Sequence, residues 1–183
     1  MAAAPIELRR LSPEDAALFR EIRLEGLRRD PDAFGSTVEV ESAQPLSIFA
    51  ERLDRSTVFG AFCGPELVGV AGFVVQPGPK HAHKGLLWGM YVRPGARQTG
   101  IGRKLVETII EHARSRVELI QLSVVSDNHA ARRLYASLGF EEYGLDRRGA
   151  KYRGEYHDDV LMAKMLVLDS GEDLVAQSGD ARR

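Results

Sequence analysis

The stretch Arg97-Gln98-Thr99-Gly100-Ile101-Gly102 decides how this sequence is interpreted, because of its position in the chain. It follows a strand-like apolar run over residues 86–92 and opens a strongly periodic helical pattern over residues 101–116. Glycine lets the backbone turn tightly and approach a ligand closely, and the first N–H groups of a helix have no acceptor within it. A loop of such N–H groups ahead of a helix dipole suits a pyrophosphate. The stretch therefore predicts binding of a phosphorylated cofactor, with extra positive charge from Arg103 and Lys104.

The patterns on either side of this loop predict an α/β protein with a mixed sheet and helices on both faces. The strand–helix–strand unit through Arg97 should be a parallel, right-handed crossover. Residues 33–41 look irregular. The predicted strands are residues 6–11, 57–63, 67–76, 86–92, 119–125, 156–168 and one that begins at 140–143. The predicted helices are residues 12–29, 45–55, 101–116 and 129–138.

Length and composition indicate one globular domain over residues 1–168, followed by a polar, disordered tail over residues 169–183. The net charge of −1 offers no general attraction for nucleic acid or an anionic membrane. No run of apolar residues approaches membrane-spanning length, and no signal peptide is visible, so we expect a cytoplasmic protein. The single cysteine, Cys63, cannot form an internal disulfide.

A second motif lies downstream of the glycine loop, with Asn128, Ala131, Leu134-Tyr135 and Gly139-Phe140 in that order. Together the two motifs resemble the GNAT superfamily of acetyl-CoA-dependent N-acetyltransferases, over about residues 6–168. The resemblance implies a central, mostly antiparallel sheet of about seven strands, flanked by about four helices. It also implies that strands four and five splay apart at a bulge, with the thioester in the gap.

The resemblance also implies roles for particular residues. The hydroxyl of Tyr135 would protonate the thiolate of coenzyme A, and Asn128 would contact the pantetheine, cap the next helix, or do both. A backbone N–H at Tyr91 or Val92 would stabilise the oxyanion. The residues implied in binding coenzyme A are Met90, Tyr91, Val92, Arg97, Gln98, Thr99, Gly100, Ile101, Gly102, Arg103 and Asn128.

Transfer of an acetyl group to an amine requires a neutral amine, and a free alkyl amine with a pKa of about 10.4 is almost wholly protonated at neutral pH. A base or a water relay must remove that proton, or the pocket must lower the pKa of the amine. The predicted fourth strand, residues 86–92, contains no acid. The base is therefore left open between side chains and a water chain that ends at a backbone carbonyl. The candidates around the acceptor site are Glu39, Glu41, Tyr156, Asp158 and His83.

The function predicted from these features is an N-acetyltransferase that moves acetyl from acetyl-CoA to a primary amine by direct attack in a ternary complex. The acceptor is a small molecule, a protein N-terminus or a lysine. The alternative is a non-catalytic acyl-CoA-binding sensor or partner subunit. No metal site is expected, since His81 and His83 lie in a polar loop. Exposed sheet edges favour a homodimer.

Overall fold

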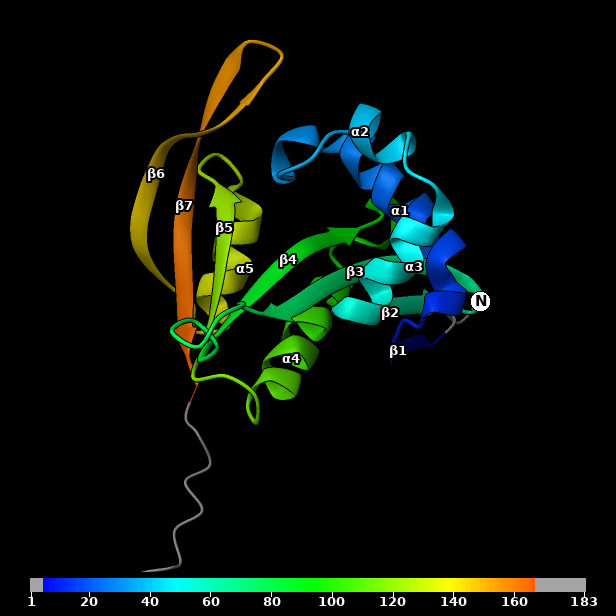
Figure 1. Ribbon diagram of the computed structural model, residues 1–183, viewed down its shortest axis with the longest axis horizontal. Coiled ribbons are helices and arrows are strands. Elements are labelled where there is room, and N and C mark those ends of the chain that lie inside the picture. The colour runs from blue at the N-terminus through cyan, green and yellow to red at the C-terminus, as the bar shows by residue number, and fades with distance from the viewer. Residues whose placement is uncertain (1–4, 167–183) are drawn as a thin grey trace, which may run out of the picture.

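The computed structural model describes residues 5–166, which form one seven-stranded sheet with the strand order β1-β2-β3-β4-β5-β7-β6 (Figure 1). Every neighbouring pair is antiparallel except β4–β5, which is parallel. This topology confirms the predicted α/β fold and its parallel crossover through α4. The strands are β1 (Ile6–Arg10), β2 (Thr57–Cys63), β3 (Glu66–Val75), β4 (Lys84–Val92), β5 (Leu119–Val125), β6 (Glu141–Tyr152) and β7 (Glu155–Met165).

The helices lie close to their predicted positions. Short 3-10 turns cover Pro13–Asp15, Pro31–Ala33 and Pro94–Ala96. The α-helices are α1 (Ala16–Arg29), α2 (Val38–Ser42), α3 (Leu46–Arg55), α4 (Ile101–Ala113) and α5 (His129–Ser137). No helix within residues 5–166 is long and apolar enough to cross a membrane.

Two helical segments differ from the sequence-based predictions. The segment 33–41, expected to be irregular, contains α2, whose first turn is capped by the Thr37 hydroxyl. A five-residue helix is too short to produce a recognisable apolar period. The helix α4 ends at Ala113, because residues 114–116 form a turn. The predicted tail 169–183, and the last two residues of the predicted domain and final strand, lie outside the described residues.

Two hydrophobic clusters pack on opposite faces of the sheet. Successive residues of a strand point to opposite sides, and along β3 Val70 joins the cluster under α1 and α3, whereas Ala71 joins the cluster under α4. Tyr91 of β4 belongs to the first cluster, and Tyr135 of α5 belongs to the second. The helices thus cover both faces of the sheet, as predicted.

The strands β4 and β5 run together for only three residue pairs, from Lys84–Leu119 to Leu86–Gln121. Beyond Leu86, β4 stays with β3, while β5 stays paired with β7 along its whole length. The register of β4 against β3 shifts between Tyr91 and Trp88, and Gly89 within this bulge has a φ of +61°. A bulge bends its strand and increases its twist, which accounts for the gap that opens between β4 and β5. The predicted splay at a bulge is confirmed.

Candidate active site

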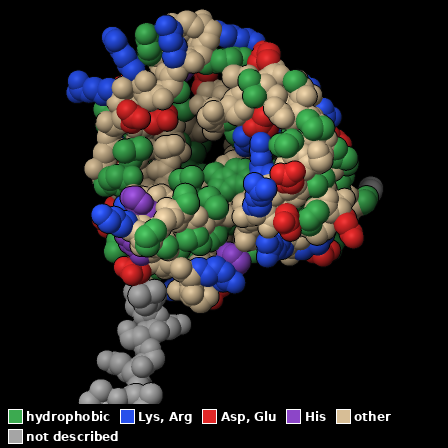
Figure 2. Space-filling view, viewed as in Figure 1, with side chains coloured by type: hydrophobic (Ala, Val, Ile, Leu, Met, Phe, Trp, Pro, Cys, Tyr) green, Lys and Arg blue, Asp and Glu red, His purple; other side chains and the backbone are tan. Residues whose placement is uncertain are grey.

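A cleft of about 750 Å³ occupies the gap between the separating ends of β4 and β5. We call it the main cleft. Its walls are the ends of these two strands, the first turn of α4, one face of α5 and residues 29–34 after α1. Figure 2 shows a hollow in the middle of this face of the molecule, with hydrophobic side chains on its floor. Since the two strand edges leave backbone groups unpaired there, the cleft suits an extended, partly polar ligand.

The loop before α4 forms one end of the main cleft. The backbone is left-handed at Gln98, with a φ of 63°, and at Gly100, with a φ of 83°. None of the backbone N–H groups of residues 98–103 donates a hydrogen bond to another group within residues 5–166. This is a run of consecutive donors at the positive end of a helix dipole, which is the arrangement that binds phosphate groups.

Side chains hold this loop in place without using those donors. The guanidinium of Arg97 donates to the carbonyl of Val92 at 2.9 Å and to Asp30 at 2.6 Å. The hydroxyl of Thr99 donates to the carbonyl of Ala96 at 2.6 Å. The loop is therefore anchored to the end of β4 and to the segment after α1, while its N–H groups keep their hydrogen-bonding capacity for a ligand.

Tyr135 lies on the wall of the main cleft formed by α5. Its ring is buried and packs edge-on against Phe140, with 5.7 Å between the ring centroids. Burial raises the pKa of the Tyr135 hydroxyl to about 12. No group within residues 5–166 forms a hydrogen bond with this hydroxyl. The phenol is therefore a fully protonated donor whose partner is not supplied by the described part of the protein.

Asn128 has one definite structural role. Its side-chain oxygen accepts a hydrogen bond from the N–H of Ala131 at 3.1 Å, so it caps α5 and fixes the helix that carries Tyr135. Asn128 also lines the main cleft, so the cap and the contact with a ligand are compatible.

The other residues predicted to bind coenzyme A divide into two groups. Met90, Tyr91, Val92, Arg97, Gln98 and Gly102 line the main cleft. The hydroxyl of Tyr91 donates to Glu25 at 3.0 Å. Burial, and then the Glu25 carboxylate, raise the pKa of this hydroxyl to about 12. Thr99, Gly100, Ile101 and Arg103 belong to the loop or to α4 but do not line the cleft. Arg103 donates to the hydroxyl of Ser137 at 2.7 Å.

A smaller cavity of about 310 Å³ adjoins the main cleft, and we call it the side pocket. It lies between residues 31–37, the end of β5 and the β6–β7 hairpin. Asp159 and Lys151 line the side pocket only, whereas Asp32 and His157 line both cavities. A ligand entering by the side pocket would therefore meet one entering by the main cleft beside Asp32 and His157.

Four of the five acceptor-site candidates from the sequence, Glu39, Glu41, Tyr156 and Asp158, line neither cavity. Glu41 is 3% exposed and pairs with Arg23 at 2.8 Å. Glu39 is exposed, with its carboxylate 3.9 Å from Arg153. Tyr156 is 52% exposed and carries the cations of Arg148 and Lys151 over its ring, and Asp158 accepts a hydrogen bond from the Arg148 N–H at 2.8 Å.

The alternation of side chains along β7 explains why neighbouring residues were missed. Val160 and Met162 point into the cluster under α4, so Tyr156 and Asp158 share their side of the strand. His157 and Asp159 take the opposite side and line the side pocket. The period-two pattern was a signal in the sequence, but only the assembled sheet shows which face of β7 lines the side pocket.

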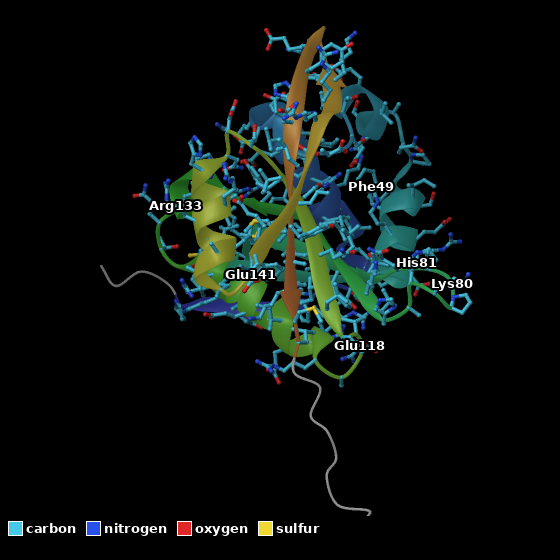
Figure 3. All side chains as sticks on the ribbon, turned by 90° about the vertical axis from the view of Figure 1, so that its left-hand side faces the viewer. Phe49, Lys80, His81, Glu118, Arg133 and Glu141 are labelled. Carbon is cyan, nitrogen blue, oxygen red and sulfur yellow. The ribbon has the colours of Figure 1, made fainter. Side chains whose placement is uncertain are left out.

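The remaining histidines singled out in the sequence lie away from the cavities. His81 is exposed in the loop between β3 and β4, beside Lys80 (Figure 3). Neither His81 nor His83 lines the main cleft or the side pocket.

Comparison with known proteins identifies the family to which this site belongs. The family model described as the acetyltransferase (GNAT) family matches residues 23–140, which include the bulge, the loop before α4 and Tyr135. The chain therefore belongs to the GNAT family of acetyltransferases. It is a GNAT-type N-acetyltransferase, a class of enzyme that uses acetyl-CoA, and the resemblance drawn from the sequence is confirmed.

Curated relatives agree with this assignment. The chain is 37% identical over 113 residues to N-alpha-acetyltransferase RimI of Mycobacterium tuberculosis, a match covering 62% of this chain and 66% of that protein. It is 28% identical over 165 residues to the L-amino acid N-acetyltransferase AaaT of Escherichia coli, covering 87% and 98% of the two chains.

Solved structures share the fold. An acetyltransferase of the GNAT family from Streptococcus pneumoniae superposes with a TM-score of 0.78 at 24% identity, covering 89% of this chain and all of that one. A ribosomal-protein-alanine N-acetyltransferase from Brucella melitensis gives a TM-score of 0.77 at 26% identity, covering 87% and 99%.

Proposed function

We propose that this protein transfers an acetyl group from acetyl-CoA to an α-amino group, with Tyr135 as the proton donor to the departing thiolate. The observation that carries the proposal is the run of N–H groups at residues 98–103, which have no acceptor within residues 5–166. They lie at one end of a cleft whose wall bears the Tyr135 hydroxyl, which likewise has no hydrogen-bond partner among those residues. In this arrangement the N–H groups bind the pyrophosphate, and the edge of β4 at Met90, Tyr91 and Val92 holds the pantetheine.

The two adjoining cavities support direct transfer in a ternary complex. Acetyl-CoA occupies the main cleft and the acceptor enters by the side pocket, so the two substrates meet where the cavities share residues 31–34, Ser123, Val125 and His157. Holding both reactants in this way replaces a bimolecular encounter and contributes several kcal/mol to catalysis, on the order of 7–11 in the best cases. No covalent intermediate on the protein is needed.

The role of Tyr135 follows from its environment. A phenol with a pKa of about 12 keeps its proton throughout the neutral range, so the donor is always in place. As the C–S bond breaks, this proton moves to the sulfur, and the phenolate regains a proton from the nitrogen that has just formed the amide. The net result is that a proton from the amine ends on the thiol.

The acceptor class is supported by the relatives and by local charge. One relative is named as an N-alpha-acetyltransferase and another as an L-amino acid N-acetyltransferase, so both names describe α-amines. Asp32 and Asp159 line the side pocket and attract an ammonium group. An α-amine has a pKa of about 7.7–8.0, so it needs less help to become neutral than an alkyl amine does.

Thermal melting and thiol release test this function together. We expect acetyl-CoA to raise the melting temperature, since a ligand that binds only the folded state stabilises it. We then expect thiol release with L-amino acids or with a peptide that begins with alanine, and much less with spermidine. Stabilisation without thiol release from any of these amines would instead favour the binding protein considered from the sequence.

The substitution Tyr135→Phe tests the proton donor. We expect kcat to fall by about 10²-fold or more, while the stabilisation by acetyl-CoA is unchanged, because only the hydroxyl is lost. Tyr143→Phe is the matched control, since Tyr143 is 55% exposed on β6 and lines neither cavity. Equal turnover by wild type and Tyr135→Phe would remove this role from Tyr135.

A further inference from the structure

We propose that His157 is the general base that removes the proton from the acceptor amine, and that Asp32 positions its imidazole. This inference rests on the proposed function and assigns the one group that the sequence left open. It concerns a histidine on β7 and an aspartate in the turn after α1, which are far apart in the chain and meet only in the folded protein.

The position of His157 is the first argument. A base in this reaction must reach a nitrogen that lies between the two substrates. Of the residues that line both cavities, Asp32 and His157 carry side chains that titrate, and the others are Pro31, Ala33, Phe34, Ser123 and Val125. The base is thus restricted to the pair Asp32 and His157 if it is to face both substrates directly.

The geometry of the pair indicates that His157 is the base and that Asp32 positions it. The Nε2 atom of His157 lies 3.5 Å from Oδ1 of Asp32, and the side chains are 17% and 48% exposed, respectively. The Asp32 carboxylate therefore lies against one edge of the imidazole and orients the ring. With Nε2 toward Asp32, Nδ1 is the nitrogen that accepts the proton from the amine.

His157 is also held by the sheet. It pairs with Ala150 of β6 in the antiparallel ladder, so its backbone is fixed at the floor of the side pocket. The other charged or titratable groups that line this pocket are Asp159, on the same side of β7, and Lys151 and Tyr152 on β6. Asp159 lies opposite Asp146 in the ladder and does not line the main cleft.

Two other acids near the site, Asp30 and Glu41, are held in ion pairs. The carboxylate of Asp30 is bound by Arg97 at 2.6 Å, and that of Glu41 is bound by Arg23 and Arg52. Neither one can take a proton without breaking an ion pair.

The complete step balances as follows. The imidazole of His157 takes one proton from the ammonium group, and the nitrogen lone pair forms a C–N bond to the thioester carbonyl carbon. The C–S bond then breaks, the thiolate takes the proton of Tyr135, and the phenolate takes the second proton from nitrogen. His157 finally releases its proton to solvent, which leaves an amide, a thiol and one proton.

The test is the pH dependence of His157→Gln, with the amine that wild type turns over best among the L-amino acids and a peptide that begins with alanine. We expect kcat/KM at pH 7 to fall by about 10²-fold or more, and the deficit to shrink above pH 9, where the amine is already neutral. We expect Asp32→Asn to lower kcat/KM at pH 7 by a smaller factor, of several-fold, and this deficit should also shrink above pH 9. Stabilisation by acetyl-CoA should match that of wild type in both variants.

His81→Gln is the matched control, because His81 is exposed and lines neither cavity. A His157→Gln enzyme within twofold of wild type, or one with an equal deficit at every pH, would overturn the assignment. If His157→Gln does not fold, Asp32→Asn provides the test. A pH profile of kcat/KM equal to that of wild type in Asp32→Asn would then contradict the roles proposed for both residues. A wild type that acetylates no amine contradicts the proposed function itself, which separates that failure from a failure of His157 alone.

Discussion

Glu41 shows how one residue can resemble a catalytic acid in the sequence and have another role in the fold. Its carboxylate accepts hydrogen bonds from Arg23, whose guanidinium lies 4.8 Å from the Phe34 ring, and from Arg52 at 3.2 Å. Burial opposes ionisation of Glu41, but the two arginines outweigh it and lower the pKa of the carboxyl. The network ties α1, α2 and α3 to the Phe34 segment, which forms a wall of both cavities.

We therefore expect Glu41→Gln to reduce the free energy of unfolding at pH 7 by about 3 kcal/mol, because a buried arginine loses its counter-charge. A lowered folded-state pKa stabilises the protein above the unfolded pKa of about 4.3, so the difference from wild type should diminish as the pH falls below that value. Urea denaturation at several pH values measures this. Glu51→Gln is the control, since the Glu51–Arg55 pair is exposed and should contribute less than about 0.5 kcal/mol.

At the scale of the element, the bulge in β4 determines the shape of the site. Gly89 has a φ of +61°, and a Cβ atom there would lie 3.0 Å from Nη1 of Arg23. The bulge changes the register of β4 against β3 just where β4 leaves β5. The same few residues therefore open the main cleft and orient the strand edge against which we place the pantetheine.

We expect Gly89→Ala to lower stability by about 1–2 kcal/mol, since a left-handed backbone is strained with a Cβ atom. We also expect a fall in kcat, because relief of that strain would shift the edge of β4. Urea denaturation and steady-state kinetics measure the two effects. The control is Gly95→Ala, where a Cβ atom meets nothing within 4 Å. A Gly89→Ala enzyme with wild-type stability and turnover would contradict this account of the bulge.

At the scale of the whole molecule, the sheet consists of two parts joined by three residue pairs between β4 and β5. Strands β1 to β4 with α1 and α3 form one part, and β5, β7 and β6 form the other (Figure 1). The loop before α4 forms one end of the main cleft, whereas residues 149–152 of the β6–β7 hairpin line the side pocket only. The binding of the two substrates should therefore be separable by mutation.

Ala150→Trp tests this separation by filling the side pocket. We expect the KM for the acceptor amine to rise at least tenfold, with the Kd of acetyl-CoA unchanged, because Ala150 does not line the main cleft. Leu145→Trp is the control on the same strand, since Leu145 is 50% exposed and lines neither cavity. Equal losses of affinity for both substrates in Ala150→Trp would show that the cavities are not independent.

Much of the fold and half of the site could be predicted from local patterns. Strand and helix periods, the glycines at residues 100 and 102 and the order of the two motifs define the crossover and the loop before α4. Each of these features spans only a few consecutive residues, so it can be recognised in the sequence alone. The bounds of β5, residues 119–125, agree with the prediction to the residue.

The side pocket, where we place the acceptor, depended on tertiary structure, because it is assembled from segments more than a hundred residues apart. Asp32 and His157 become neighbours only when the β6–β7 hairpin stands beside the turn after α1. Likewise, Glu41 forms an ion pair with Arg23 and lines neither cavity. The pleat of β7 places His157, and not Tyr156, in the wall of the side pocket. The sequence by itself determined the family and the glycine loop before α4, since the motifs that indicate them are short and local. The fold decided which ionisable groups line the two cavities, since that depends on long-range packing.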